Sequence, residues 1–343
     1  AADPLILAFT SGTSASPKGV VASHQTALSA LMNATPLLGL QPGDTILSVA
    51  AFTHMFGMMV VHWSLHVGGA LLLLPQFRPD LYANLVETGR PDVLFTAPAH
   101  VAGCAQAGLF DGRDLTSVRS AIFSGAVCPP DLAQRFDDMI VNGQVHQMYG
   151  MTEAMVMAFT RLDDSPEVRH HACGRVVPGQ ALRVVAPETG EVLGAGEEGE
   201  IQVSGCSVLA SYLANPDATE AAFADGRWFR TGDLGTLDGD GNVRIVGRIK
   251  DVINRGGVKI NPTDVEALIE AHPRVVNAAI IAMPDSRLGE KACCFATVAP
   301  GETLTLDDVG AWLSEHRIAK QKWPERLVVV DDLPMTPTRK IIK

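Results

Sequence analysis

The sequence is short of aromatic residues and of cysteines for a chain of 343 residues. Aromatic side chains make up 6% of it, and its six cysteines include no CxxC pair. Their irregular spacing argues against a disulfide framework or a zinc ribbon. We expect the thiols to be reduced and largely buried, as in a cytoplasmic protein.

Basic residues are also in the minority, and long hydrophobic runs are missing. Lys and Arg number 27 against 38 Asp and Glu, a net charge of -11, so nucleic acid is not an expected partner. The most apolar window, residues 58–75, is interrupted by histidines and glycines, and it predicts a buried helix and strand rather than a membrane span. No signal peptide is visible, and because the chain opens directly on an apolar strand we expect its start to be cut.

The first half of the sequence alternates short apolar runs with amphipathic stretches. The apolar runs predict strands at 5–9, 45–49, 70–74, 93–95, 120–123 and 145–148. The stretches between them predict helices at 23–38, 55–66, 80–88, 98–107 and 130–139. This alternation predicts an α/β fold with a mostly parallel sheet covered by helices.

The pattern changes at about residue 182. Short, glycine-punctuated runs predict a small antiparallel or barrel-like unit, and after a charged connector at 247–251 the order is helix, strand, strand, helix, strand. We therefore predict a large N-terminal domain at 1–249, which includes a barrel-like subdomain at 182–247. A small α+β C-terminal domain at 250–343 follows it.

The strongest local motif is TSGTSASPKG at residues 10–19, directly after an apolar strand. Its small residues let backbone N–H groups approach an anion, while hydroxyls and Lys18 add donors and positive charge. The candidate phosphate-binding residues are Thr10, Ser11, Gly12, Thr13 and Lys18. The motif lacks the order of a Walker A loop, and taken alone it is also compatible with an ordinary turn beside an exposed lysine.

This motif resembles the phosphate loop of the adenylate-forming superfamily, which comprises acyl-CoA synthetases, adenylation domains of peptide synthetases and luciferases. Ser14-Ala15 stand where the family usually has Thr-Gly. The resemblance extends over nearly the whole chain, although the family has a further long segment before this loop. It implies a large AMP-binding domain followed by a mobile C-terminal domain.

Two stretches resemble the family's adenine-binding elements. The first is the turn Ser124, Gly125 and Ala126, and the second, similar to the YGxTE signature, is Gln147, Met148, Tyr149, Gly150, Met151, Thr152 and Glu153. The resemblance implies that Tyr149 stacks on adenine, Thr152 hydrogen-bonds the α-phosphate and Glu153 helps to hold Mg²⁺.

Further motifs follow toward the C-terminus. In RTGD, Asp233 would accept both ribose hydroxyls, and Arg248 would lie beside the same ribose. Lys250 matches the hinge about which the C-terminal domain swings. Gly256 and Gly257 resemble the loop that lets the pantetheine arm of CoA pass close to the backbone. A solvated linker and an ordinary glycine turn are the simpler alternatives.

Two more residues complete the catalytic set that the resemblance implies together with Thr152 and Glu153. His54 matches a position beside the acid pocket and the α-phosphate, with a core histidine as the alternative. Lys340, in a PxTxxGK-like element, would bridge the acid's carboxylate and the α-phosphate, although Arg339 replaces the usual glycine. A frayed basic terminus is its alternative.

Residues 51–59 contain no acidic side chain that could pair with the ammonium group of an amino acid. Met55, Phe56, Met58 and Met59 instead predict an adaptable apolar wall. We predict an acyl-CoA ligase that joins a small or medium-chain apolar acid to CoA, with ATP and Mg²⁺, giving AMP and pyrophosphate.

The resemblance is closest to medium-chain fatty acid and cyclohexanecarboxylate CoA ligases. Loading of an acyl carrier protein, or an inactive fragment of such an enzyme, remain as alternatives, and a homo-oligomer is compatible with the sequence. A basic cluster is expected either to attract the phosphates of CoA or an acidic carrier, or to be merely solvated; it consists of Arg317, Lys320, Lys322 and Arg326.

Overall fold

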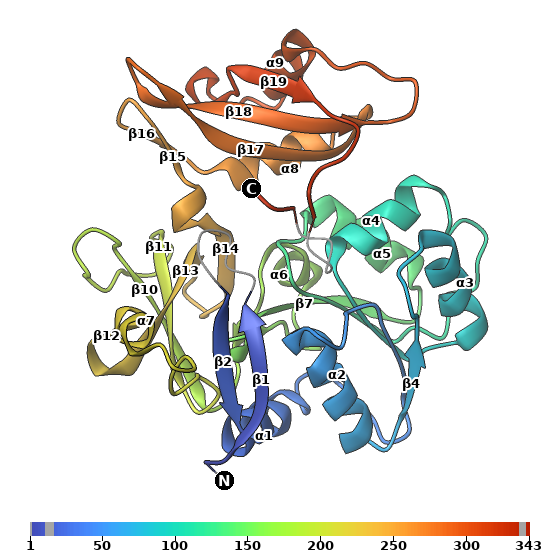
Figure 1. Cartoon of the computed structure of the whole chain (residues 1–343). Coiled ribbons are helices and arrows are strands. Elements are labelled where there is room, and N and C mark those ends of the chain that lie inside the picture. Colours follow the sequence, from blue (N-terminus) through green and yellow to red (C-terminus); the bar gives the residue numbers. More distant parts are fainter. Residues whose placement is uncertain (1, 11–16, 336–340) are drawn as a thin grey trace. The chain divides into compact units, whose positions relative to one another are not determined.

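The computed structural model describes residues 2–10, 17–335 and 341–343. The chain divides into two compact units, both drawn in Figure 1. The first holds residues up to Thr231 together with Thr236–Ile245, and the second holds Gly232–Gly235 and most of the chain from Val246 onward. The predicted domain boundary after residue 249 stays a prediction.

The first unit is built on a seven-stranded sheet with the order β4-β3-β5-β6-β7-β8-β9. Its first five strands are parallel, and the last two extend it with antiparallel pairing. The strands are β3 (Thr45–Ser48), β4 (Ala70–Leu73), β5 (Val93–Thr96), β6 (Ser120–Phe123), β7 (Gln144–Met151), β8 (Met155–Phe159) and β9 (Arg175–Val176). The expectation of an α/β fold with a mostly parallel sheet is confirmed.

Helices cover both faces of this sheet because successive strand residues point to opposite sides. Ile46 packs in one buried cluster with α1 (His24–Ala34) and α2 (Met55–His66), and its neighbour Leu47 packs in another. The second cluster contains residues of α3 (Pro79–Gly89), α4 (Pro98–Gln106) and α5 (Pro130–Met139). A short helix, α6 (Pro166–His171), follows β8.

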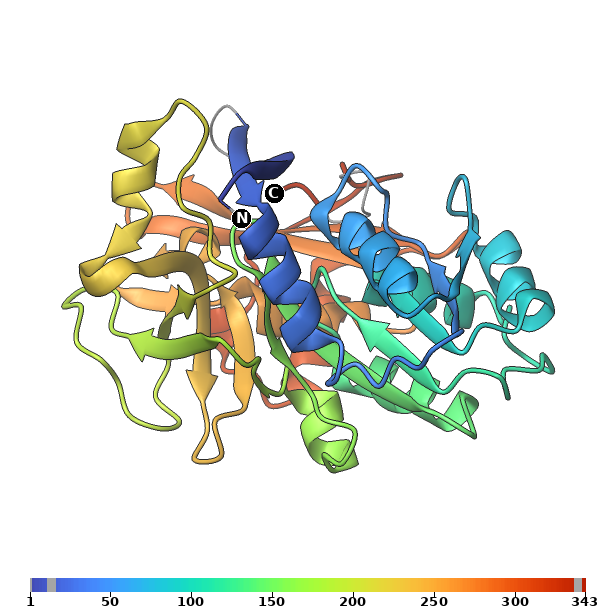
Figure 2. The same ribbon diagram turned by 90° about the horizontal axis from the view of Figure 1, so that it is seen from below.

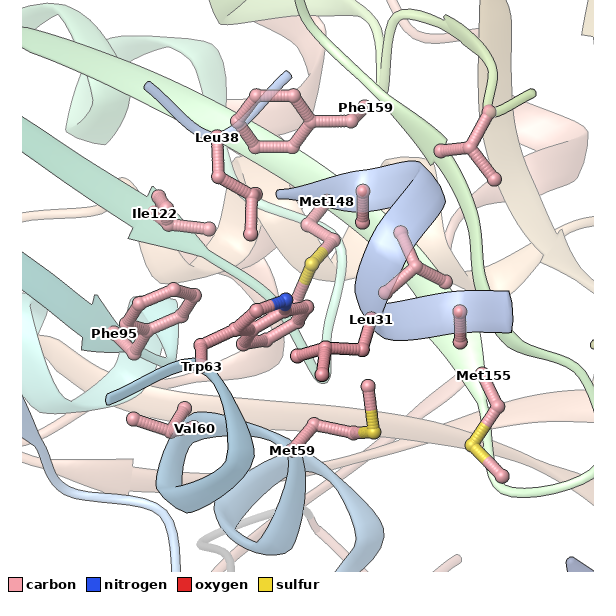
Figure 3. Close-up of a cluster of buried hydrophobic side chains, with 14 of the residues drawn as sticks. Leu31, Leu38, Met59, Val60, Trp63, Phe95, Ile122, Met148, Met155 and Phe159 are labelled. Atoms are coloured by element: carbon pink, nitrogen blue, oxygen red, sulfur yellow. The ribbon is translucent and has the colours of Figure 1, made fainter. Parts of the chain in front are cut away.

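Figure 3 shows the first cluster, at whose centre Trp63 of α2 stacks on Phe95 of β5. The ring centroids are 5.2 Å apart and the planes differ by 12°. Met59 and Met148 pack beside the indole, so α2 and β7 share one core.

The phosphate-loop motif is flanked by two strands, β1 (Pro4–Thr10) and β2 (Lys18–Ser23). They form an antiparallel sheet of their own rather than joining the parallel sheet, which differs from the simple alternation read from the sequence. Figure 2 shows α1, in blue, leaving this pair. The Ser23 hydroxyl caps α1 by accepting from the Thr26 N–H at 3.1 Å.

The expected small β unit is present as a five-stranded sheet with the path β10-β11-β13-β12, and β14 pairs with β13. The β10–β11 and β12–β13 pairs are antiparallel. The elements are β10 (Gln180–Val185), β11 (Gly199–Gly205), α7 (Pro216–Ala221), β12 (Phe223–Ala224), η1 (Asp225–Arg227), β13 (Trp228–Leu237) and β14 (Val243–Arg248).

The second unit contains a five-stranded sheet with the order β16-β15-β18-β17, in which β19 pairs in parallel with β18. Its elements are η2 (Ile249–Asp251), β15 (Ile253–Arg255), β16 (Val258–Ile260), α8 (Pro262–Glu270), β17 (Val275–Asp285), β18 (Gly289–Val298), α9 (Leu306–Glu315), η3 (Lys320–Lys322) and β19 (Arg326–Val329). Residues of α8 and α9 share one buried cluster with β17 and β18. The expectation of a small α+β unit is confirmed.

The six cysteines are all free, and four of them are buried. Within the described ranges, none of the helices combines the length and apolar character needed to cross a bilayer.

Candidate functional site

The two ends of the phosphate-loop motif meet where β1 ends and β2 begins. Thr10 is the register partner of Lys18, and its hydroxyl donates to the Lys18 carbonyl at 3.5 Å. Ser11, Gly12 and Thr13 lie outside the described residues. The phosphate-binding role of the motif stays a prediction.

Lys18 and Glu153 are linked through Tyr212, a side chain that belongs to none of the sequence motifs. The Lys18 ammonium lies 4.9 Å from the centroid of the Tyr212 ring, within the range of a cation–π contact. The Tyr212 hydroxyl donates to Glu153 Oε1 at 3.0 Å. The predicted phosphate-binding cation and the predicted metal-binding carboxylate therefore flank one aromatic ring.

The stretch that resembles YGxTE forms the end of β7 and the turn into β8. Tyr149 is only 8% exposed, and Thr152 and Glu153 are half-buried in the turn. A Cβ on Gly150 would lie 2.2 Å from the Met155 carbonyl oxygen, so this tight hairpin requires glycine. The turn thus holds Thr152 and Glu153 on a closely packed backbone.

Two other residues of this stretch point into the interior. The Gln147 side-chain amide donates to the carbonyls of Arg169 and His170, at 3.0 and 2.8 Å, and so supports α6. Met148 packs in the core around Trp63 (Figure 3). Contacts of these two residues with a nucleotide would therefore involve mainly their backbone.

The turn Ser124–Ala126 follows β6, directly beside β7. Phe123 pairs in parallel with Gln147, so the carboxyl ends of both strands reach the same edge of the sheet. Gly125 has φ 88°, a left-handed conformation that favours glycine, and a Cβ there would contact nothing within 4 Å. The structure thus brings the two predicted adenine-binding elements to one edge, where ligands bind in open α/β sheets.

His54 lies at the same edge, after β3, as the N-cap residue of α2. Its side chain is exposed, and its Nδ1 accepts from the Phe56 N–H at 3.2 Å. A neutral His54 therefore carries its proton on Nε2. The alternative of a core histidine does not hold.

Asp233 and Arg248 belong to the second unit and form an ion pair. Arg248 Nε donates to Asp233 Oδ1 at 2.9 Å, and the Asp233 side chain is 12% exposed. The predicted proximity of the two residues is present, while their contact with ribose stays a prediction.

The remaining predicted residues lie on turns of the second unit or outside the described chain. Lys250 is in η2, and Gly256 and Gly257 form the β15–β16 turn with φ 58° and 91°. Lys340 is outside the described residues. Described residues on either side of it in the sequence are hydrogen-bonded to each other, since the Ile342 N–H donates to the Pro334 carbonyl at 2.8 Å.

Tyr212 was missed because it lies in a stretch of small and apolar residues without charge or a glycine-rich pattern. The one available signal was an aromatic residue in a chain with only three tyrosines. The link between residues 18, 153 and 212 depends on tertiary structure, which sequence spacing does not reveal.

Comparison with known proteins gives two family matches. Residues 1–213 match the family described as AMP-binding enzyme, and residues 264–340 match the AMP-binding enzyme C-terminal domain. The chain is 31% identical over 352 residues to 4-coumarate–CoA ligase 1 of Oryza sativa subsp. japonica, covering 99% of this chain and 62% of that protein.

Two solved structures are also similar over nearly the whole chain. ATP-bound MatB from Rhodopseudomonas palustris has a TM-score of 0.89 and 30% identity, with 99% of this chain and 67% of that chain covered. The o-succinylbenzoate CoA synthetase MenE from Bacillus subtilis, in complex with the acyl-adenylate intermediate OSB-AMP, has a TM-score of 0.87 and 26% identity. In that comparison 98% of this chain and 67% of that chain are covered.

Proposed function

Because the chain belongs to the AMP-binding enzyme family, we propose that it activates a carboxylic acid with ATP and transfers the acyl group to CoA. The observation that carries this proposal is the grouping of Lys18 and Glu153 around Tyr212. Glu153 follows β7, at the edge of the parallel sheet where ligands of such folds bind. The chain spans 62% of the length of the rice relative, so the activity of the whole protein is part of the proposal.

The first step forms an acyl-adenylate. A carboxylate oxygen of the acid attacks the α-phosphorus of ATP, a new P–O bond forms, and the bond to the bridging oxygen of pyrophosphate breaks. The contribution expected from the protein is positioning and charge stabilisation rather than a covalent nucleophile. Lys18 supplies positive charge toward the phosphates, Thr152 a hydroxyl donor and Tyr149 an aromatic surface for the base.

The residues present fit Mg²⁺ bound together with ATP. The described part of the chain contains no group of three or more His, Cys, Asp or Glu side chains that could hold a metal ion. Mg²⁺ is commonly held by one or two carboxylates together with substrate phosphates and water, so Glu153 supplies a suitable protein ligand. When bound, Mg²⁺ neutralises part of the charge on the phosphates.

The second step transfers the acyl group to the thiol. The thiol sulfur attacks the acyl carbonyl, its proton passes to solvent, and the bond to AMP breaks. Gly256 and Gly257, which form a turn without side chains, are suited to a close approach by the pantetheine arm. The resemblance assigns Lys250 to the hinge and Lys340 to the first step, in which it would bridge the acid's carboxylate and the α-phosphate.

The proposed acid is apolar and small or of medium chain length. Two of the four residues predicted to face the acid, Met55 and Met59, belong instead to the buried core: they are 4% and 2% exposed and pack in the first cluster. Phe56 and Met58 are half-buried and remain the candidates to face the acid. A cytoplasmic location fits six free thiols.

A product assay tests the function. The chain is incubated with ATP, Mg²⁺ and a panel of carboxylic acids, with CoA or with an acyl carrier protein as acceptor, and AMP and thioester are measured by chromatography. We expect AMP and acyl-CoA with apolar acids. Acylation of the carrier alone would favour the alternative acceptor, and hydrolysis of ATP to ADP would overturn the proposal.

A further inference from the structure

The segment that carries Tyr212 is fixed by its backbone to both candidate phosphate-binding elements. On one side, Leu213 N–H donates to the Gly19 carbonyl at 2.8 Å, and Tyr212 forms a β-bridge with Val20. On the other side, Leu209 N–H donates to the Glu153 carbonyl at 2.7 Å. Residues 209–213, which we name the brace, therefore join β2 to the β7–β8 turn.

The side chain of Tyr212 is held as firmly as the brace. It is 6% exposed and belongs to a buried cluster with Val20, Tyr149 and Leu209. Its backbone N–H donates to the Thr219 hydroxyl at 3.0 Å. A ring fixed in this way can determine where the flexible side chains on either side of it rest.

The hydroxyl of Tyr212 acts as the donor in its bond to Glu153. An ionised carboxylate can only accept, so the phenol hydroxyl supplies the proton of this 3.0 Å contact. A carboxylate has about four acceptor positions, so one hydrogen bond leaves capacity for a metal ion. The bond restricts the side-chain torsions of Glu153 without neutralising its charge.

We propose that Tyr212 is a positioning residue that fixes the Glu153 carboxylate for the metal–nucleotide complex and the Lys18 ammonium for its phosphates. This inference rests on the proposed function and deepens it. Side chains that are already ordered lose less entropy when a ligand binds. The brace thus holds both charged side chains beside one ring before ATP binds.

Two substitutions separate the two contacts. Tyr212→Phe removes the hydroxyl but keeps the ring under Lys18, whereas Tyr212→Leu removes both. Tyr82→Phe is the matched control, because it removes the hydroxyl of another buried tyrosine, in the separate cluster around α3. Thermal melting of all three variants reports whether the fold is kept.

The test measures binding of Mn²⁺ in the presence of ATP by electron paramagnetic resonance, and binding of ATP without a divalent ion by calorimetry. For Tyr212→Phe we expect Mn²⁺ binding about tenfold weaker, from the loss of a hydrogen bond to a charged group, with metal-free ATP binding unchanged. Tyr212→Leu should weaken both, and Tyr82→Phe neither.

The outcomes distinguish this inference from the proposed function. If the unchanged chain binds neither ATP nor Mn²⁺ with ATP, the proposed function fails. If the unchanged chain binds both and Tyr212→Phe binds Mn²⁺ with ATP equally well or more tightly, the positioning role is overturned while the function stands.

Discussion

We expect Glu270, a half-buried residue of α8, to make the stability of the second unit depend on pH. The Glu270 Oε1 accepts a hydrogen bond from the Ala278 N–H at 3.1 Å. Glu266 lies one helical turn before Glu270, and its carboxylate pairs with the Lys343 ammonium at 2.7 Å. Burial raises the pKa of Glu270 from 4.5 to about 7. The perturbation that tests this is Glu270→Gln, which keeps an oxygen for Ala278 but cannot ionise.

The sign follows from proton binding. Below pH 4.5 the carboxyl is protonated in the folded and the unfolded chain alike. As the pH rises toward about 7 the unfolded chain releases its proton first, so the free energy of unfolding falls. A pKa near 7 in the folded chain, against 4.5 in the unfolded chain, lowers the free energy of unfolding by at most about 3 kcal/mol once the pH is well above 7.

The assay is urea unfolding of the second unit near pH 5 and near pH 8, followed by hydrogen exchange in peptides from α8 and β17. Glu270→Gln should gain stability over the unchanged chain on going from the lower to the higher pH, by up to about 3 kcal/mol. Glu315→Gln, on the exposed side of α9, is the control and should show no such gain. An equal effect of Glu270→Gln at both pH values would refute the reasoning.

Three further predictions concern the candidate site. Gly150→Ala places a Cβ 2.2 Å from a backbone carbonyl oxygen of β8. This clash should lower the free energy of unfolding by about 1–3 kcal/mol and weaken ATP binding. Gly103→Ala is the control, because its added Cβ meets nothing within 4 Å, and it should have neither effect. Asp233→Asn should weaken binding of ATP about tenfold but not that of inorganic tripolyphosphate, which lacks ribose, as calorimetry would show; equal losses for both ligands would contradict the ribose role. Neutralising Lys320 and Lys322 should raise the KM for CoA and leave ATP–pyrophosphate exchange intact. An unchanged KM would contradict a role of the basic cluster in attracting CoA and would favour the alternative that these side chains are only solvated.

Local patterns predicted most of the elements that carry the site. The helices at 55–66 and 130–139 and the strand at 120–123 have the expected bounds, because prolines, apolar periodicity and turn residues mark them within the sequence. The sequence did not predict that β7 turns back into β8, since the tight hairpin depends on Gly150 and a left-handed Met155 with φ 57°.

Features that depend on pairing between distant segments were less accessible. A strand was expected at residues 5–9, within the observed β1, but its antiparallel partner β2 was not, because an apolar run does not reveal which strand it pairs with. The sequence predicted that Met55 and Met59 would face a ligand, but both are core residues. The prediction failed because a helix face that binds an apolar ligand and one that packs in the core have the same composition. The contact between Tyr212 and Glu153 was also inaccessible, because it forms only when the brace packs against the β7–β8 turn.

Formation of an acyl-adenylate is the central claim, and exchange of labelled pyrophosphate into ATP tests it most directly. With Mg²⁺ and apolar carboxylic acids of small to medium chain length, the chain should catalyse exchange that depends on the acid, does not need CoA and is lost in Glu153→Gln. Absence of acid-dependent exchange from a folded chain that binds ATP would contradict the account.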